Sequence, residues 1–375
     1  MKKKLALALV FVMGLSFTAC GKTTVSDSTN EAVSGGVQST DTNEDKESSG
    51  KSDKTTITFI NGFTGGDGEY MTKIVDGFNE SQSDYYIEQL QDADHYTKFK
   101  SGDFDMLIIH ADWISTYHAM GLLREVSDIY DMAGISFEND FHDITKTYAK
   151  YDDGVFAFPL DLYAETTFYN KEYTDEAPKD YNDMIELRDK LDSENSGIYP
   201  YGLPLTGDQQ WAWMTALGQC GVNWVEDEHI KLDTEEACDA FMKIHDMIYK
   251  DHLSPAGLGA DDHFNTFISQ SETAANVKTV VSMTGPWKYT VAKEVLGDNL
   301  GIGTVPQIYG DKKCVPAGGH TFGVSSKVTD EKKIAGIAAF MKYTYQPDVL
   351  LNWADSGQAP VHLATMEVVK ANPEK

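Results

Sequence analysis

Strand and helix patterns alternate along the chain from residue 55, and this alternation restricts the fold more than any other feature. Residues 55–60 alternate polar and apolar side chains, as a half-buried strand does, and a Gly-rich turn follows them. The next elements are expected to be a helix at 69–79, strands at 86–90 and 104–109, and a helix at 113–120. Strands that alternate with helices at this spacing pair in parallel, so the sequence predicts an α/β sheet.

Patterns of the same mixed kind continue beyond Pro159. The expected elements are helices at 181–191, 211–219, 234–250 and 331–345, and strands at 280–283 and 302–305. The helix at 234–250 is expected to face inward with Ala237, Phe241, Ile244 and Ile248. Because 375 residues suffice for roughly two domains, two α/β lobes are predicted.

The N-terminus has the features of a secretory signal. Three lysines precede an apolar run at 5–17, which is too short for a bilayer span of ~20 residues. The segment Phe17-Thr18-Ala19-Cys20 resembles a bacterial lipobox, so residues 1–19 are predicted to be removed and Cys20 to carry lipid on its sulfur. This places the chain on the outer face of the cytoplasmic membrane, in a Gram-positive cell. The alternative is an ordinary signal peptide with a chance cysteine.

Residues 20–53 are predicted to be a flexible tether. They are rich in Ser, Thr, Gly and Asp and lack aromatic residues, so no burial offsets the entropy of ordering them. Three further cysteines, Cys220, Cys238 and Cys314, cannot all pair, which argues against a disulfide framework. They are expected to be small buried apolar residues.

The charge excludes several classes of partner. Acidic residues outnumber basic ones by 59 to 31, and the net charge of -28 repels both nucleic acid and anionic lipid headgroups. The acidity is interpreted as a source of solubility, and a monomer is expected.

Common catalytic and cofactor motifs are missing from the sequence. The Gly-rich segment at 62–68 lacks the Lys-Ser/Thr ending of a P-loop and the spacing of a dinucleotide fingerprint. The sequence also lacks a His-Glu-x-x-His pattern, paired zinc cysteines and a Gly-x-Ser-x-Gly elbow. We therefore assign no catalytic residue, metal ligand or cofactor, although counting carboxylates does not exclude a glycosidase pair.

Polar residues stand beside aromatic ones at several strand or helix boundaries. The six cases are Asn61–Thr64, His110–Trp113, Phe158–Asp161, Asp208–Trp213, Gly285–Trp287 and Gly318–His320. Ligands of open α/β sheets bind beyond the carboxyl ends of strands, where such residues can meet. Sugars need this combination, because their C–H faces stack on aromatic rings and their hydroxyls bond to carboxylates and amides. Trp113 and Trp287 are favoured as site residues, whereas Trp213, Trp224 and Trp353 are equally compatible with a core.

Several segments in order resemble a known family. They are ITFINGFTGGDGEYMTKIVDGFNE, HADWISTYHAMGLL, FAFPLDLYAETTFYNK, SMTGPWKY, GIGTVPQI and SGQAPVH, from Thr55 to near the end. They resemble the family 1 extracellular solute-binding proteins, the sugar receptors of ABC importers. The resemblance implies a maltose-binding-protein-like architecture of the periplasmic-binding-protein type, with two α/β lobes joined by a hinge and a ligand cleft between them.

The resemblance also implies ligand contacts. The residues concerned are Phe63, Thr64, Asp112, Trp113, Asp161, Asp208, Trp211, Trp287 and His320. Asp112 is expected to accept hydrogen bonds from sugar hydroxyls, and Trp287 to be the stacking platform. Asp208 and Trp211 are expected to come from the C-lobe.

The implied lobes are discontinuous. Crossovers near 160–164, 303–305 and 355–358 would give an N-lobe of 54–162 plus 304–354 and a C-lobe of 163–303 plus 355–375. Family members usually continue for several helices beyond the segment that matches SGQAPVH, so a C-lobe truncated at its C-terminus is expected.

The expected function is capture of a mono- or oligosaccharide and its delivery to ABC permease subunits, without catalysis. Three alternatives stay open: a secreted carbohydrate-active enzyme using a pair such as Asp112 and Asp161, a binding protein for a non-sugar solute, and a sugar sensor without transport.

Overall fold

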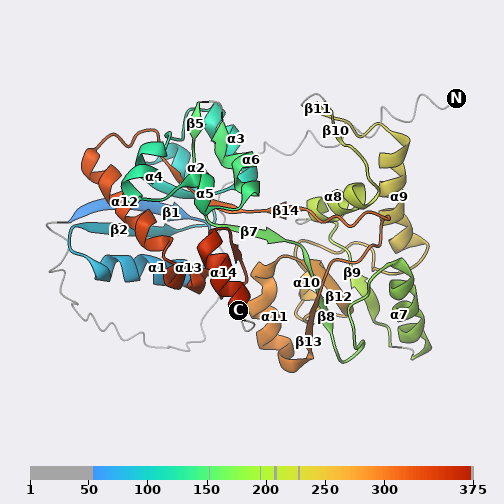
Figure 1. The fold of residues 1–375 in the computed structure, drawn as a ribbon. Coiled ribbons are helices and arrows are strands. Elements are labelled where there is room, and N and C mark those ends of the chain that lie inside the picture. Colours follow the sequence, from blue (N-terminus) through green and yellow to red (C-terminus); the bar gives the residue numbers. More distant parts are fainter. Residues whose placement is uncertain (1–53, 152, 195, 207–208, 227–228, 373–375) are drawn as a thin grey trace, which may run out of the picture. The chain divides into compact units, whose positions relative to one another are not determined.

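The computed structural model describes residues 54–372, apart from 152, 195, 207–208 and 227–228 (Figure 1). The expected signal peptide, Cys20, the whole tether and Asp208 lie outside the described residues. Among the described residues, each helix is too short or too polar to cross a membrane.

The N-lobe is built on a five-stranded sheet in the order β2-β1-β3-β15-β6. Its strands are β1 (Thr55–Asn61), β2 (Tyr85–Gln91), β3 (Met106–His110), β6 (Phe158–Pro159) and β15 (His320–Val324). β1 is parallel to β2 and β3, which confirms the predicted pairing, whereas β15 is antiparallel to β3. The central strands are buried because helices cover the sheet.

The N-lobe helices carry apolar faces at helical spacing. They include α1 (Gly68–Ser81), α2 (His95–Ser101), η1 (Ala111–Trp113), α3 (Ile114–Ala119), α4 (Ser127–Ala133), α5 (Phe137–Asp140), η2 (Asp143–Thr145), α6 (Lys146–Ala149), α12 (Glu331–Thr344), α13 (Pro347–Ala354) and α14 (Leu363–Ala371), with the small hairpin β4 (Lys150–Tyr151) and β5 (Gly154–Val155). Asp330 caps α12 by accepting the Lys332 N–H, and Pro347 opens α13. Phe59, Phe322 and Phe340 meet at the centre of this core.

The C-lobe has a four-stranded sheet in the order β13-β8-β12-β9. These strands are β8 (Thr166–Asn170), β9 (Tyr199–Gly202), β12 (Thr279–Thr284) and β13 (Leu300–Gly303). The surrounding elements are α7 (Tyr181–Ser193), α8 (Gln209–Gln219), α9 (Glu235–Tyr249), α10 (Asp262–Asn265), η3 (Pro286–Lys288), α11 (Tyr289–Leu296), η4 (Gly297–Asn299) and the hairpin β10 (Val225–Glu226) and β11 (His229–Ile230). β12 is buried along its whole length, as a strand covered on both faces should be.

Three short strands form a separate sheet that joins the lobes, in the order β14-β7-β16. β7 (Asp161–Ala164) runs in the middle and pairs antiparallel with β14 (Ala317–Gly318) and with β16 (Ala359–Pro360). The three strands come from remote parts of the chain and meet here. Figure 1 labels two of them, β7 and β14. We call this the connecting sheet.

The lobe boundaries differ from the expected ones at two places. Ile308 and Tyr309 pack in the C-lobe core, so the second crossing falls near β14 and not near 303–305. Val361 lies in the N-lobe core and α14 packs on α13, so this part of the predicted C-lobe belongs with the N-lobe. In Figure 1 the red C-terminal helix α13 accordingly lies beside the blue helix α1. Burial of Val361 and the contact of His362 with Phe141 hold the segment before α14 against the N-lobe.

Two smaller expectations were also wrong. On α9 the buried stripe runs through Ala237, Ala240, Met247 and Ile248, while Phe241 is 37 % exposed. Ala240, next to Phe241 in sequence, takes the buried position, and α9 packs on α8. Cys238 and Cys314 are exposed and Cys220 is half-buried, so these cysteines are not core residues.

Candidate ligand-binding site

Aromatic rings from both lobes meet at Tyr163 of the connecting sheet. The ring centroid of Tyr163 lies 6.1 Å from that of Trp211, 5.4 Å from that of Trp287 and 4.9 Å from that of His320. The two indoles are 5.9 Å apart. Three residues predicted from sequence, Trp211, Trp287 and His320, are therefore brought together by one that was not predicted.

The N-lobe adds two more rings. His320 contacts Phe63 at 4.9 Å and His110 at 4.8 Å between centroids, and Phe63 packs on Trp353 at 4.9 Å. Trp353 is fully buried and so is a core residue. We define the junction cluster as six residues: Phe63, His110, Tyr163, Trp211, Trp287 and His320.

Glycines allow two of these rings to lie against the backbone. A Cβ on Gly285 would stand 1.8 Å from the Trp287 indole, and one on Gly318 would stand 2.6 Å from the Tyr163 ring. Any larger residue would therefore displace the ring. The first glycine of the Gly-Pro-Trp and Gly-Gly-His segments is therefore required to make room for a ring, as well as to form a turn.

Two carboxylates lie in the electrostatic field of His320. Asp112 is exposed on η1, and desolvation raises the pKa of its carboxyl despite opposing backbone hydrogen bonds and His320. Desolvation also raises the pKa of Asp67, with a smaller contribution from Asp161, while His320 opposes the shift. Asp67 was missed, although it is the one carboxylate in the Gly-rich segment.

Trp113 and Thr64 are peripheral. Trp113 is 43 % exposed and stacks on Tyr96, with centroids 5.4 Å apart and an interplanar angle of 26°. Tyr96 in turn accepts a hydrogen bond from the His110 backbone N–H at 2.9 Å, which connects Trp113 to the junction cluster. Thr64 is exposed on the loop after β1.

Burial keeps His110 neutral. Desolvation, with the fields of His320 and His95, lowers the pKa of His110 to about 3. The Tyr96 hydroxyl lies within hydrogen-bonding distance of Nδ1 of His110. His110 is thus a neutral polar group at physiological pH.

Asp161 differs from its predicted role as a ligand contact. Its side chain is fully buried. Oδ1 accepts the His320 backbone N–H at 2.8 Å, and Oδ2 accepts the indole N–H of Trp353 at 2.7 Å. Nδ1 of His320 is 2.9 Å from Oδ2 and 3.1 Å from Oδ1. Both oxygens are therefore occupied by protein donors.

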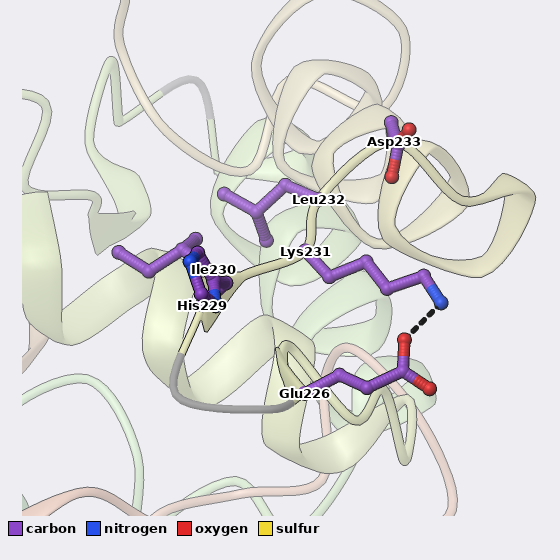
Figure 2. A pocket seen from close by; sticks show the side chains of 6 residues that line it. All are labelled: Glu226, His229, Ile230, Lys231, Leu232 and Asp233. Carbon is purple, nitrogen blue, oxygen red and sulfur yellow. Dashed lines mark hydrogen bonds and ion pairs between the residues drawn. The ribbon is translucent and has the colours of Figure 1, made fainter.

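Two surface depressions lie elsewhere, in the C-lobe. One of about 650 Å³ is formed by the hairpin β10–β11 and the residues that follow it, and Figure 2 shows the Glu226–Lys231 ion pair beside it. All six of its lining residues are exposed. The other, of about 440 Å³, is lined by residues between Tyr173 and Lys190. Neither contains a predicted site residue. Among the described residues, no group of three His, Cys, Asp or Glu side chains is suitable for a metal ion.

Comparison with known proteins gives consistent matches. The model of the family described as "Bacterial extracellular solute-binding protein" matches residues 73–374. The sn-glycerol-3-phosphate-binding periplasmic protein UgpB of Rhizobium meliloti is 24% identical over 353 residues, covering 84% of this chain and 77% of the relative. A maltotriose-binding protein of Pyrococcus abyssi is 24% identical over 266 residues, covering 68% of this chain and 54% of the relative.

Solved structures agree in fold. Maltose-bound MalE3 of Thermotoga maritima has a TM-score of 0.70 at 20% identity, covering 85% of both chains. UgpB of Mycobacterium tuberculosis, in complex with glycerophosphocholine, has a TM-score of 0.71 at 15% identity, covering 85% of this chain and 84% of the other. These likenesses establish two α/β lobes of the periplasmic-binding-protein type, which confirms the predicted fold class.

Proposed function

The chain belongs to the bacterial extracellular solute-binding proteins, and from this we infer that it captures a neutral carbohydrate at the junction cluster for delivery to an ABC permease. One observation supports this most: indole, phenol and phenyl rings meet in the junction cluster, and the Asp67 and Asp112 carboxylates interact electrostatically with its His320. Rings suit the apolar faces of a sugar, and carboxylates accept its hydroxyls.

The negative charge of the site favours one of the two ligand classes that relatives bind. Names of the matched proteins include maltose and maltotriose on one side, and sn-glycerol-3-phosphate and glycerophosphocholine on the other. A phosphate requires cationic or N–H donors. Here Asp67 precedes α1, and its charge and that of Asp112 oppose an anion. A neutral saccharide is therefore favoured.

Individual contacts follow from position. Trp287 and Trp211 supply stacking surfaces from the C-lobe, while Asp112, Asp67 and His320 act on hydroxyls from the N-lobe. Phe63, Thr64 and Trp113 border the ligand, and Asp208, which precedes α8 in the sequence, is kept as a contact implied by the family resemblance. We do not propose catalysis. A glycosidase pair of Asp112 and Asp161 would need a free carboxyl group at Asp161, but both of its oxygens accept hydrogen bonds from His320 and Trp353.

Location completes the proposed role. Lipid on Cys20 holds the protein at the outer face of the cytoplasmic membrane, residues 21–53 tether it, and the protein works as a monomer with permease subunits as partners. Labelling of cells with radioactive palmitate should mark the wild-type protein and not Cys20→Ala. Equal labelling of both would contradict the anchor.

Isothermal titration tests the ligand class. The panel contains glucose, maltose, maltotriose, other neutral oligosaccharides, sn-glycerol-3-phosphate and glycerophosphocholine. Binding of at least one neutral saccharide is expected, with no heat from the phosphates. Binding confined to the phosphates, or silence from protein with a native circular dichroism spectrum, would overturn the proposal.

A further inference from the structure

Asp161 lies in the connecting sheet, where three remote segments of the chain meet. It is the first residue of β7, the central strand of the connecting sheet, and it pairs with Pro360 of β16. His320, which it binds, lies two residues beyond β14. Trp353, which it also binds, belongs to α13, the helix that precedes β16. One buried carboxylate is therefore bonded to residues close to all three strands of the connecting sheet.

The partners of Asp161 restrict how it can bond to His320. A backbone N–H and an indole N–H can only donate, and they occupy different oxygens of the carboxyl group. As a carboxylate, Asp161 offers only acceptors, both to these two donors and to the imidazole. The bond between Asp161 and Nδ1 of His320 is then a donation from the histidine, and Nδ1 carries the hydrogen.

The other ring nitrogen of His320 stays available. Within the described part of the chain, Nε2 makes no hydrogen bond. The ring is only 5% exposed and lies among Phe63, His110 and Tyr163 of the junction cluster. In a neutral imidazole with hydrogen on Nδ1, Nε2 has a lone pair and accepts hydrogen bonds.

We propose that Asp161 is a positioning residue that fixes His320 in the Nδ1–H tautomer, so that Nε2 is an acceptor for a ligand hydroxyl. Through Trp353 and the connecting sheet, the same carboxylate holds this acceptor in a fixed place relative to the three strands of that sheet. The acceptor role rests on the proposed function, whereas the tautomer does not. The charged or titratable groups that act on or surround His320 are Asp67, Asp112, Asp161, His95, His110 and Tyr163.

The first experiment is independent of any ligand. Nitrogen-15 NMR of the imidazole side chains, with His320 assigned from a His320→Asn spectrum, reads the tautomer directly in the free protein at about pH 8, above the usual histidine pKa. Hydrogen on Nδ1 and an unprotonated Nε2 are expected. Hydrogen on Nε2, or on both nitrogens, would overturn the proposal even if the protein binds no sugar.

The second experiment uses variants. Asp161→Asn removes the charge that selects the tautomer and should shift the His320 signals toward a mixture. A matched control is Asp105→Asn, because Asp105 is also a buried N-lobe carboxylate, bonded to Thr58 and Lys333. It should leave the His320 signals unchanged. Equal shifts in both variants would indicate a general loss of structure and contradict a specific role.

The third experiment is isothermal titration with a neutral saccharide that the ligand panel shows to bind. Asp161→Asn and His320→Asn should each weaken binding by about tenfold or more, as loss of a buried hydrogen bond does, and Asp105→Asn by less than about twofold. His320→Asn keeps a donor toward Asp161 but lacks the distal acceptor. Unchanged affinity in His320→Asn would overturn the acceptor role. Absence of saccharide binding by the wild type, with the expected tautomer, would instead refute the proposed function and with it the ligand contact.

Discussion

The two halves of the junction cluster are built differently. The N-lobe half is polar and held by buried hydrogen bonds, since His320 is fixed by Asp161 and His110 by Tyr96. The C-lobe half consists of Trp211 and Trp287, whose rings contact each other and Tyr163. A buried polar contact also occurs on the C-lobe side, where Glu165 accepts a hydrogen bond from Thr215 of α8 at 2.7 Å.

This difference separates two tasks in recognition. Direction-dependent hydrogen bonds require groups held in place before the ligand arrives. Stacking tolerates rotation and sliding of the ring, so it supplies area more than orientation. We expect the N-lobe half to distinguish hydroxyl patterns and the C-lobe half to determine how much affinity any neutral sugar obtains.

The largest effect is expected at Trp287. Trp287→Ala should weaken saccharide binding by about 2–3 kcal/mol, because it removes a large ring at the centre of the site. Trp224→Ala is the matched control, since Trp224 packs on Trp213 away from the junction cluster. Isothermal titration measures both. Equal losses, or none at Trp287, would show that the C-lobe half does not supply the stacking area.

A smaller loss is expected at Asp112. Asp112→Asn should cost about 1.5–2 kcal/mol of binding, the value of a hydrogen bond to a charged group. The loss should depend on the stereochemistry of the sugar more than the loss at Trp287 does. Asp128→Asn is a suitable control, because that carboxylate pairs with Arg124 on the N-lobe surface. A uniform loss across all saccharides would remove the proposed distinction between the two halves.

Acid should destabilise both lobes through buried histidines. Burial lowers the pKa of His110 to about 3 and that of His263, in the C-lobe, to about 4. Unfolded histidine titrates near 6.5, so between these values the unfolded chain binds more protons and stability falls as the pH falls. Each residue should cost about 1–2 kcal/mol at pH 5.

Urea unfolding at pH 7 and pH 5 measures this loss. His110→Gln and His263→Gln should each reduce the difference between the two pH values, the first in the N-lobe and the second in the C-lobe. An unchanged difference in either variant would contradict the assignment for that lobe.

The smallest effect is expected at Trp113. Its indole is 43 % exposed and stacks on Tyr96, so Trp113→Ala should weaken binding by about 0.5–1 kcal/mol. Titration alongside Trp287→Ala gives the comparison directly. A loss as large as that at Trp287 would place the main stacking surface in the N-lobe.

Local pattern was sufficient for much of the fold. The alternation at 55–60 and the apolar spacing of Met71, Ile74 and Phe78 predicted β1 and α1, and the parallel pairing of β1 with β2 and β3 followed from their order. The resemblance to extracellular solute-binding proteins was also confirmed. The predicted elements depend on short-range periodicity, and the resemblance depends on the order of short motifs along the chain. A single sequence contains both kinds of information.

The site was harder, because its partners are remote in sequence. Asp161 was expected to face the ligand, since it follows an aromatic residue at the end of a strand. Its actual partners lie 159 and 192 residues away, and no local pattern indicates them. Tyr163 was missed for the same reason. The second crossing was misplaced because β14 has two residues, too few to produce a strand pattern.

The bonds of Asp161 also constrain the order in which the molecule can assemble. Strand β7 is synthesised well before His320 and Trp353, so the carboxylate has neither partner until most of the chain has been made. Contacts between such distant residues form slowly, since a long loop must close first. The connecting sheet and the N-lobe half of the junction cluster are therefore expected to form late in folding. This delay would favour an unfolded chain during export.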